Sequence, residues 1–280
     1  METSLSVGND AVLRSARRWI IAAYVWQIIN LFIGYWGIWP IIDYLTNQGL
    51  AFDTANIYKY RGIFYIIIFE ALLAVAFIKL KTHSNSVLRQ SATILLVAVI
   101  MSFAIYFINF INSEIYPLIL DLFWNLRSLL LFFVVIFFLV VLFSYLFIVA
   151  YAHLNKCYAI RSNHPEVVVL CILTFISSAM TICIYSFMLI YSFNGITGHG
   201  NAEMSISLYY TLSEFMTLGI SVACILCWKR LLGTPSDIPD VEEKPEKISF
   251  VPSKVEIGYL VSLLLFTAVV YTALYIILPI

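Results

Sequence analysis

The sequence predicts an all-α polytopic membrane protein, a bundle of seven transmembrane helices in one domain over residues 1–280. Composition is the first indication, because 62% of the residues are hydrophobic and 11% are charged, whereas soluble domains carry about 25% charged residues. Seven long apolar runs are the second, since about 20 apolar residues are needed to cross about 30 Å of hydrocarbon. The third is the segregation of basic residues between the segments that connect the runs.

The seven spans follow the apolar runs in order. We expect them near residues 19–42, 62–80, 92–112, 129–151, 166–192, 205–228 and 257–278. The first run is longer than the core of a signal peptide, about 7–15 residues, and is therefore interpreted as a retained anchor. Between the last two spans, residues 233–255 contain four prolines among mixed charges, which predicts a disordered cytoplasmic linker.

Basic residues fix the predicted orientation. Thirteen of the sixteen Lys and Arg residues lie in alternate connecting segments on one side, and only Lys59, Arg61 and Arg127 lie on the other. Because basic residues stay on the cytoplasmic side during insertion, the N-terminus is predicted inside and the C-terminus outside. This orientation is opposite to that of G-protein-coupled receptors. It resembles the heliorhodopsin layout, but residues 258–278 lack the Lys through which that family binds retinal, and this excludes a retinal Schiff base.

The fourth apolar run is too long for one span. It extends from Ile115 to Tyr151, which as a single helix would measure about 55 Å at 1.5 Å per residue. We therefore predict a break near Arg127, with residues 117–127 forming a short amphipathic helix on the outer surface before span four. Pro117 suits the first turn of such a helix. Span four itself has almost no polar face and is expected at the lipid-exposed periphery.

Two carboxylates lie inside predicted spans. Glu70 is near the middle of the second span, and Glu214 lies outward of the middle of the sixth. A charged carboxylate that faces lipid at this depth costs several kcal/mol, so both side chains are expected to face the bundle interior. There they would serve a proton or cation relay, or remain protonated and only join helices by hydrogen bonds.

Other polar residues recur at helical spacing and indicate which faces of the spans turn inward. On spans one, three and six these are Gln27, Asn30, Ser102, Tyr106, Asn109, Ser207, Thr211 and Ser221. On span five they are Thr174, Ser178, Thr181 and Tyr185. Together with Glu70 they are expected to line a polar cavity among spans one, two, three, five and six. The alternative is that these small and polar side chains only hold the helices together.

Several kinds of chemistry are excluded or disfavoured by the sequence. The four histidines all lie in or beside loops, so neither a metal site nor a haem cofactor is expected inside the bundle. Cys224 and Cys227 form a C-x-x-C pair within a span, without a second pair, and are interpreted as packing residues. No hydrolase, zinc-protease or P-loop motif occurs, so an enzyme is not expected. The basic residues form no stripe suited to nucleic acid.

Three classes of function remain. We favour a transporter of a small solute, a proton or a cation that uses the mid-membrane carboxylates, because such residues are costly to maintain. The alternatives are a seven-helix receptor-like sensor and a non-catalytic subunit or assembly factor of a membrane complex. The expected partners are membrane lipids, a small solute or cation, and partner membrane subunits.

Overall fold

The computed structural model is helical throughout the residues that it describes, which are 2–34, 39–49, 54–83, 85–122, 126–158, 165–194, 199–231 and 254–277. Side-chain environments are described, apart from a few positions, within 11–34, 41–49, 62–107, 134–154, 165–186, 211–229 and 254–273. The helices are α1 (Glu2–Phe32), α2 (Trp39–Asn47), α3 (Thr54–Leu80), α4 (Ser86–Leu122), α5 (Leu126–Tyr158), α6 (Pro165–Asn194), α7 (His199–Leu231) and α8 (Lys254–Ile277).

Five of these helices are long and apolar enough to cross a membrane. Their apolar segments are Gly62–Leu80, Ser86–Phe107, Val134–Leu154, Pro165–Ile184 and Thr211–Lys229, in α3 to α7. Helix α8 contributes a shorter apolar segment, Ile257–Val270. Helices of this length and composition need lipid around them, and they support a multi-pass membrane protein. The sequence prediction of an all-helical bundle is confirmed at this level.

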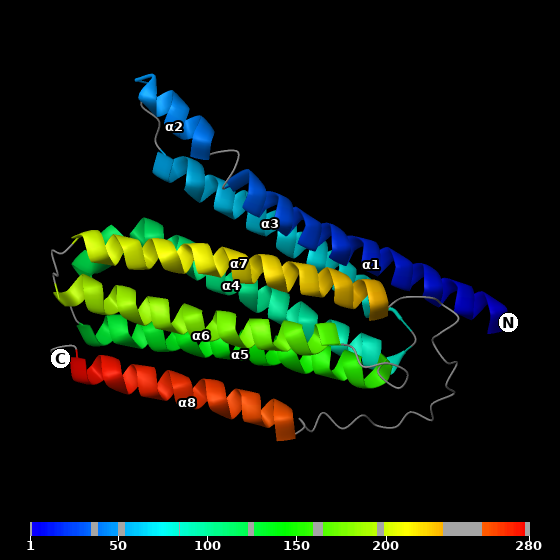
Figure 1. Ribbon diagram of the computed structural model, residues 1–280. Helices are drawn as coiled ribbons and strands as arrows, with labels where there is room; N and C mark the ends of the chain where they lie inside the picture. The colour runs from blue at the N-terminus through cyan, green and yellow to red at the C-terminus, as the bar shows by residue number, and fades with distance from the viewer. Residues whose placement is uncertain are drawn as a thin grey trace.

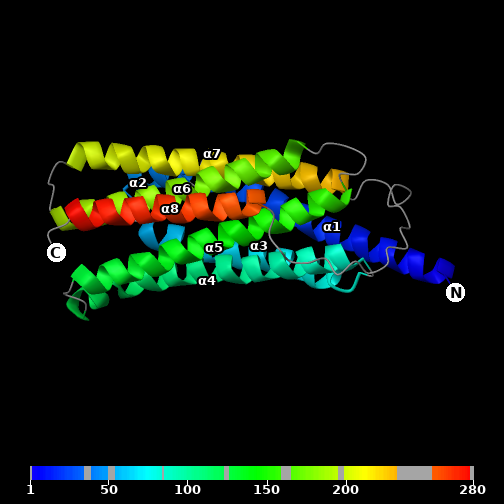
Figure 2. The ribbon, with the colours of Figure 1, turned by 90° about the horizontal axis from the view of Figure 1, so that it is seen from below.

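Six long helices form a closed ring. Neighbours in the ring are α1 and α3, α3 and α4, α4 and α5, α5 and α6, α6 and α7, and finally α7 and α1. Successive long helices run in opposite directions (Figure 1), as short connections require. Helix α8 lies outside the ring, against α5 and α6, as Figure 2 shows. Helix α8 is therefore not a member of the ring.

The two ends of the bundle differ in charge. The start of α1, the end of α3, the start of α4, the end of α7 and the start of α8 gather at one end (Figure 1). These are the segments that carry most of the basic residues, among them Arg17, Lys81, Arg89, Lys229 and Lys254. We call this the basic end. The starts of α3 and α5, the helices that carry Lys59, Arg61 and Arg127 in their first few turns, lie at the other end.

The predicted break near Arg127 agrees with the bounds of α4 and α5, but the separate short helix predicted over 117–127 is wrong. Helix α4 continues without interruption through Pro117 to Leu122, and α5 begins at Leu126. Proline is tolerated inside membrane helices because nearby groups satisfy the backbone carbonyl that it leaves free, and the apolar residues on both sides favour continuation. The separate short helix at this end is α2, which covers residues that we had assigned in part to span one. It is followed by Gly49, whose φ of 80° ends the turn.

The expectation that span four lies at the periphery is also wrong. Helix α5, which contains this span, packs against α4, α6 and α8 and makes weaker contact with α7. Ile148, Ala150, Tyr151 and Leu154 on this helix are fully or almost fully buried. The reason is that an apolar helix face packs against protein as readily as against lipid, so the lack of polar residues did not mark it as exterior. The peripheral long helix is α8.

The buried core lies toward the basic end of the ring. Alanines from several helices belong to it, among them Ala16, Ala23, Ala76, Ala92 and Ala223. Small side chains let helix backbones approach closely, which is the main source of stability between membrane helices. At the connection between α3 and α4, Asn85 caps α4, because its Oδ1 accepts hydrogen bonds from the backbone N–H groups of Val87 at 2.9 Å and Leu88 at 3.2 Å.

Candidate functional site

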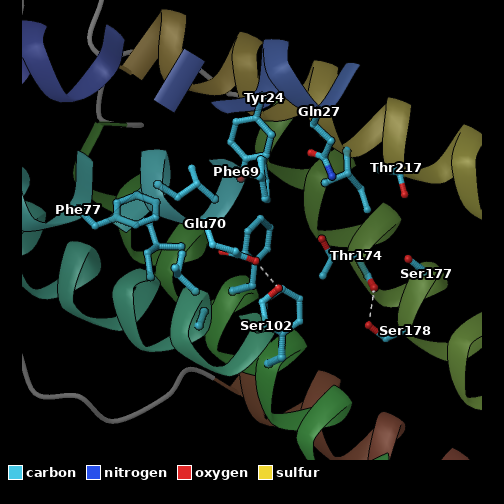
Figure 3. A pocket seen from close by; sticks show the side chains of 17 residues that line it. Tyr24, Gln27, Phe69, Glu70, Phe77, Ser102, Thr174, Ser177, Ser178 and Thr217 are labelled. Carbon is cyan, nitrogen blue, oxygen red and sulfur yellow. Dashed lines mark hydrogen bonds between the residues drawn. The ribbon is translucent and has the colours of Figure 1, made fainter. Parts of the chain in front are cut away.

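A cavity of about 190 Å³ lies inside the six-helix ring, beyond the alanine-rich core. Its polar lining residues come from α1, α3, α4, α6 and α7 and are Tyr24, Gln27, Glu70, Ser102, Thr174, Ser177, Ser178 and Thr217. The aromatic lining residues, besides Tyr24, come from α3 and α5 and are Phe69, Phe77, Phe143 and Phe147. Figure 3 shows the labelled side chains around this space. All six helices of the ring contribute to it.

Glu70 is the carboxyl group that lines the cavity within the described residues. It is 6% exposed and lies on α3, with Oε1 accepting a hydrogen bond of 2.6 Å from Ser102 Oγ on α4 (Figure 3). Its second oxygen, Oε2, is buried and has no hydrogen-bond partner among the described residues. An unsatisfied buried acceptor costs about 1–3 kcal/mol, and more when it is charged. Oε2 is therefore the atom at which a bound donor would be stabilised most.

The hydroxyl groups across the cavity from Glu70 present acceptors. Thr174, Ser178 and Thr217 donate their single hydroxyl protons at 2.8 Å to the backbone carbonyls of Leu170, Thr174 and Ser213, four residues earlier in their own helices. This arrangement uses the proton within the helix and leaves the oxygen able to accept a hydrogen bond. Ser178 also contacts Ser144 of α5 through their hydroxyl oxygens. The α6 and α7 wall is thus suited to accept hydrogen bonds.

Helix α1 supplies the third wall. Gln27 Oε1 accepts a hydrogen bond of 2.8 Å from Ser221 Oγ of α7, which joins the first and last helices of the ring. Tyr24, one turn earlier, packs its ring edge against Phe69 of α3 at a centroid distance of 5.6 Å. Polar and aromatic groups therefore alternate along this side of the cavity.

An aromatic cluster, consisting of Phe77, Phe147, Tyr151 and Trp228, closes the cavity toward the basic end. Phe77 and Phe147 line the cavity and also contact the two deeper rings, Trp228 at 6.3 Å and Tyr151 at 4.7 Å between centroids. Trp228 Nε1 donates a hydrogen bond of 2.7 Å to Tyr151 Oη, and both side chains are almost fully buried. The cluster joins α3, α5 and α7 and separates the cavity from the basic end.

The structure brings only part of the predicted site together. Gln27 and Glu70 line the cavity, whereas Asn30, Tyr106, Thr211 and Glu214 are not among its lining residues. Tyr106 instead packs over Gly62 of α3, where a Cβ atom would lie 2.5 Å from its hydroxyl oxygen. The side chain of Asn109 lies outside the described residues.

Glu214 is not among the residues that line the cavity beside Glu70. Glu214 precedes Thr217 by three residues on α7, so it lies about one helical turn farther from the basic end, on a similar face. The polar stripe of this helix continues past the cavity with Ser221, which binds Gln27. Glu70 is the only carboxylate among the described residues that line the cavity.

The aromatic residues of α5 were missed at the sequence level. Phe143 and Phe147 lie four residues apart and line the cavity, and Tyr151 follows after another four. This spacing places the three rings on one helix face. In an apolar span, however, the same spacing also occurs on faces that contact lipid, so the pattern alone could not identify an interior wall.

The three buried cysteines do not form a metal site. Within the part of the chain that the structure describes, no group of three or more His, Cys, Asp or Glu side chains is arranged to hold a metal ion. Cys224 lies in the hydrophobic core, with its sulfur 3.7 Å from Tyr151 Oη as a weak acceptor. Cys171 and Cys227 belong to the same core.

Comparison of the chain with models of protein families, with curated proteins and with solved structures found no match. The function therefore has to be argued from the cavity.

Proposed function

We propose that this chain is a seven-span membrane protein that binds a small cation or proton at Glu70 and moves it across the bilayer. In this proposal α3 to α7 provide five of the spans and α1 and α8 are the other two. The basic end faces the cytoplasm. The excess of Lys and Arg on the segments at that end supports this orientation.

The observation that carries the proposal is the unpartnered Oε2 atom of Glu70 beside the cavity. A carboxylate in a membrane span is expensive, and one whose free oxygen faces a cavity can be compensated by a bound cation. The cavity is large enough for about six water molecules at about 30 Å³ each. A proton or small cation at Oε2 would balance the charge of the carboxylate and replace the missing partner.

The proposed path uses the two glutamates in sequence. A cation that enters from the end opposite the basic end would pass the level of Glu214 first and then bind Glu70. Release toward the basic end requires the aromatic cluster to move, because its rings fill the ring interior there. Alternate opening on the two sides of a central site is how transporters of this size work.

Flux measurements in liposomes test this proposal. The purified full chain is reconstituted, a membrane potential is imposed, and the uptake of protons, rubidium and tetramethylammonium is followed. We expect at least one of these fluxes to exceed that of empty liposomes and to fall at least tenfold in Glu70→Gln. Glu166→Gln makes the same chemical change outside the cavity and should retain flux within a factor of two. Wild-type flux at the level of empty liposomes for all three cations contradicts the proposal.

A receptor-like sensor is the second candidate, and the aromatic cluster is the observation that favours it. A cavity that stays closed toward the basic end binds a ligand without passing it on. Such a protein would show saturable ligand binding that depends on Glu70, with no flux above the background in the same liposomes.

A further inference from the structure

We infer that the cavity is built for a small organic ammonium ion, whose charged nitrogen pairs with Glu70 and whose apolar body lies against aromatic rings. This inference rests on the proposed function in taking Glu70 as the group that binds the cation, and it names the class of ligand. Four properties of the cavity lead to it: its charge, the direction of its hydrogen bonds, its aromatic walls and its size.

Charge and hydrogen bonding select a monovalent donor. Glu70 is the single carboxylate on the cavity within the described residues, so one positive charge neutralises the site. Glu70 Oε2 has no hydrogen-bond donor among the described residues. The hydroxyls of Thr174, Ser178 and Thr217 donate their protons to backbone carbonyls of their own helices. A ligand with several N–H groups can therefore donate to the carboxylate and to a hydroxyl oxygen.

The aromatic walls favour an organic cation over a metal ion. Ca²⁺ and Mg²⁺ are bound by six to eight oxygen ligands, and carboxylates are usual among them. Here Phe69, Phe77, Phe143, Phe147 and Tyr24 occupy much of the surface, and no described group of acidic, His or Cys side chains is arranged for a metal. Aromatic faces instead attract ammonium groups, and aromatic rings also bury the apolar part of an amine.

The size of the cavity limits the ligand. Its volume of about 190 Å³ slightly exceeds the roughly 150 Å³ cavity that is known to hold benzene. It lies below the range of about 300–1,000 Å³ that is usual for drug-sized ligands. A ring with a short aminoalkyl arm, or an aliphatic amine of similar bulk, fits this space. A peptide or a lipid headgroup with its acyl chains does not.

Binding of benzylammonium to the full chain in nanodiscs tests the inference, with protein-free nanodiscs subtracted to remove partition into lipid. Benzyl alcohol has nearly the same shape without the charge and is the matched ligand control. We expect saturable binding of benzylammonium, at least tenfold weaker binding of benzyl alcohol, and at least tenfold weaker benzylammonium binding to Glu70→Gln. Phe147→Leu should weaken binding about threefold or more, whereas Glu166→Gln should leave it within a factor of two.

A second measurement on the wild-type protein avoids dependence on folding of the variants. A hydrophobic carbodiimide modifies carboxyl groups in membrane interiors, and mass spectrometry quantifies the modification of Glu70 and Glu166 separately. Benzylammonium should protect Glu70 at least fivefold and leave Glu166 unchanged. Equal affinity for benzylammonium and benzyl alcohol, or no protection of Glu70 at saturating benzylammonium, overturns the inference.

The two proposals fail in different ways. Saturable benzylammonium binding that depends on Glu70, without flux of any cation, would support the ligand class and contradict transport. Flux of protons or rubidium that depends on Glu70, with no binding of benzylammonium, would support transport and contradict an organic ammonium ion as the ligand.

Discussion

Replacing Tyr151 by Phe removes one oxygen atom from a buried contact that joins α5 to α7. In the folded protein Trp228 Nε1 donates to Tyr151 Oη at 2.7 Å, and the two side chains are 1% and 0% exposed. Without the hydroxyl the indole N–H loses this acceptor in a site that water does not reach, at a cost of about 1–3 kcal/mol. Hydrogen bonds between membrane helices contribute about 0.6 kcal/mol on average and about 1.7 kcal/mol at most. We therefore expect Tyr151→Phe to lower the free energy of unfolding by about 1–2 kcal/mol.

A double-mutant cycle separates this hydrogen bond from loss of packing. Tyr151→Phe, Trp228→Phe and the double variant are unfolded with SDS in mixed micelles, and helix content is followed by circular dichroism. The coupling energy should be about 0.5–1.5 kcal/mol. Tyr259→Phe is the matched control, because it removes the same oxygen from a half-buried ring of α8 that packs on Phe175, and its effect should stay within about 0.5 kcal/mol. Additive single effects with no coupling would refute the assignment of this bond as a link between α5 and α7.

Two further predictions concern the helices that form the ring, and the same SDS unfolding checks both. Asn85→Ala removes the acceptor for two backbone N–H groups at the start of α4. It should lower the free energy of unfolding by about 1 kcal/mol. An unchanged unfolding midpoint would contradict the role of Asn85 as the cap of α4. Gly219→Ala places a Cβ atom 3.3 Å from Leu173 Cδ1 of α6, a tight contact that the gain in helix propensity of about 1 kcal/mol largely offsets. Gly219→Val should instead lower the free energy of unfolding by about 1–3 kcal/mol, because the larger side chain overpacks the contact between α6 and α7. Equal stability of the Ala and Val variants would show that the two helices do not approach closely there.

Hydropathy and charge predicted much of the fold because lipid imposes simple demands on a chain. A span must satisfy its own backbone hydrogen bonds, so each apolar run of sufficient length becomes a helix. Five of the predicted spans correspond to apolar segments of α3 to α7. The segregation of basic residues matches the gathering of the corresponding helix ends in Figure 1. None of these inferences required knowledge of which helices touch.

Helix neighbours were harder to predict, for a physical reason. In lipid, both the face that packs on protein and the face that meets acyl chains are apolar, so hydrophobicity does not distinguish them. Span four was placed at the periphery on that basis, yet α5 supplies Phe143 and Phe147 to the cavity. The short helix predicted before this span is absent, because Pro117 is tolerated inside α4. Glu70 and Gln27, two of the predicted cavity residues, do line the cavity of the structure, and lipid favours such an interior position for polar groups.

The position of the cavity follows from the sizes of the side chains that meet inside the ring. Toward the basic end, alanines and the aromatic cluster fill the interior, and α1, α3 and α7 approach closely around Ala16, Ala76 and Ala223. At the level of Glu70, the polar residues that α4, α6 and α7 present to the cavity have short hydroxyl side chains, which do not fill the space between the six helices. A void lined by Ser102 and Thr217 therefore remains beside the carboxylate. Filling that void with leucines would be the direct way to stabilise the bundle, so the void and its polar groups reduce stability. Under the proposed function, a cation bound at Glu70 would offset part of this cost.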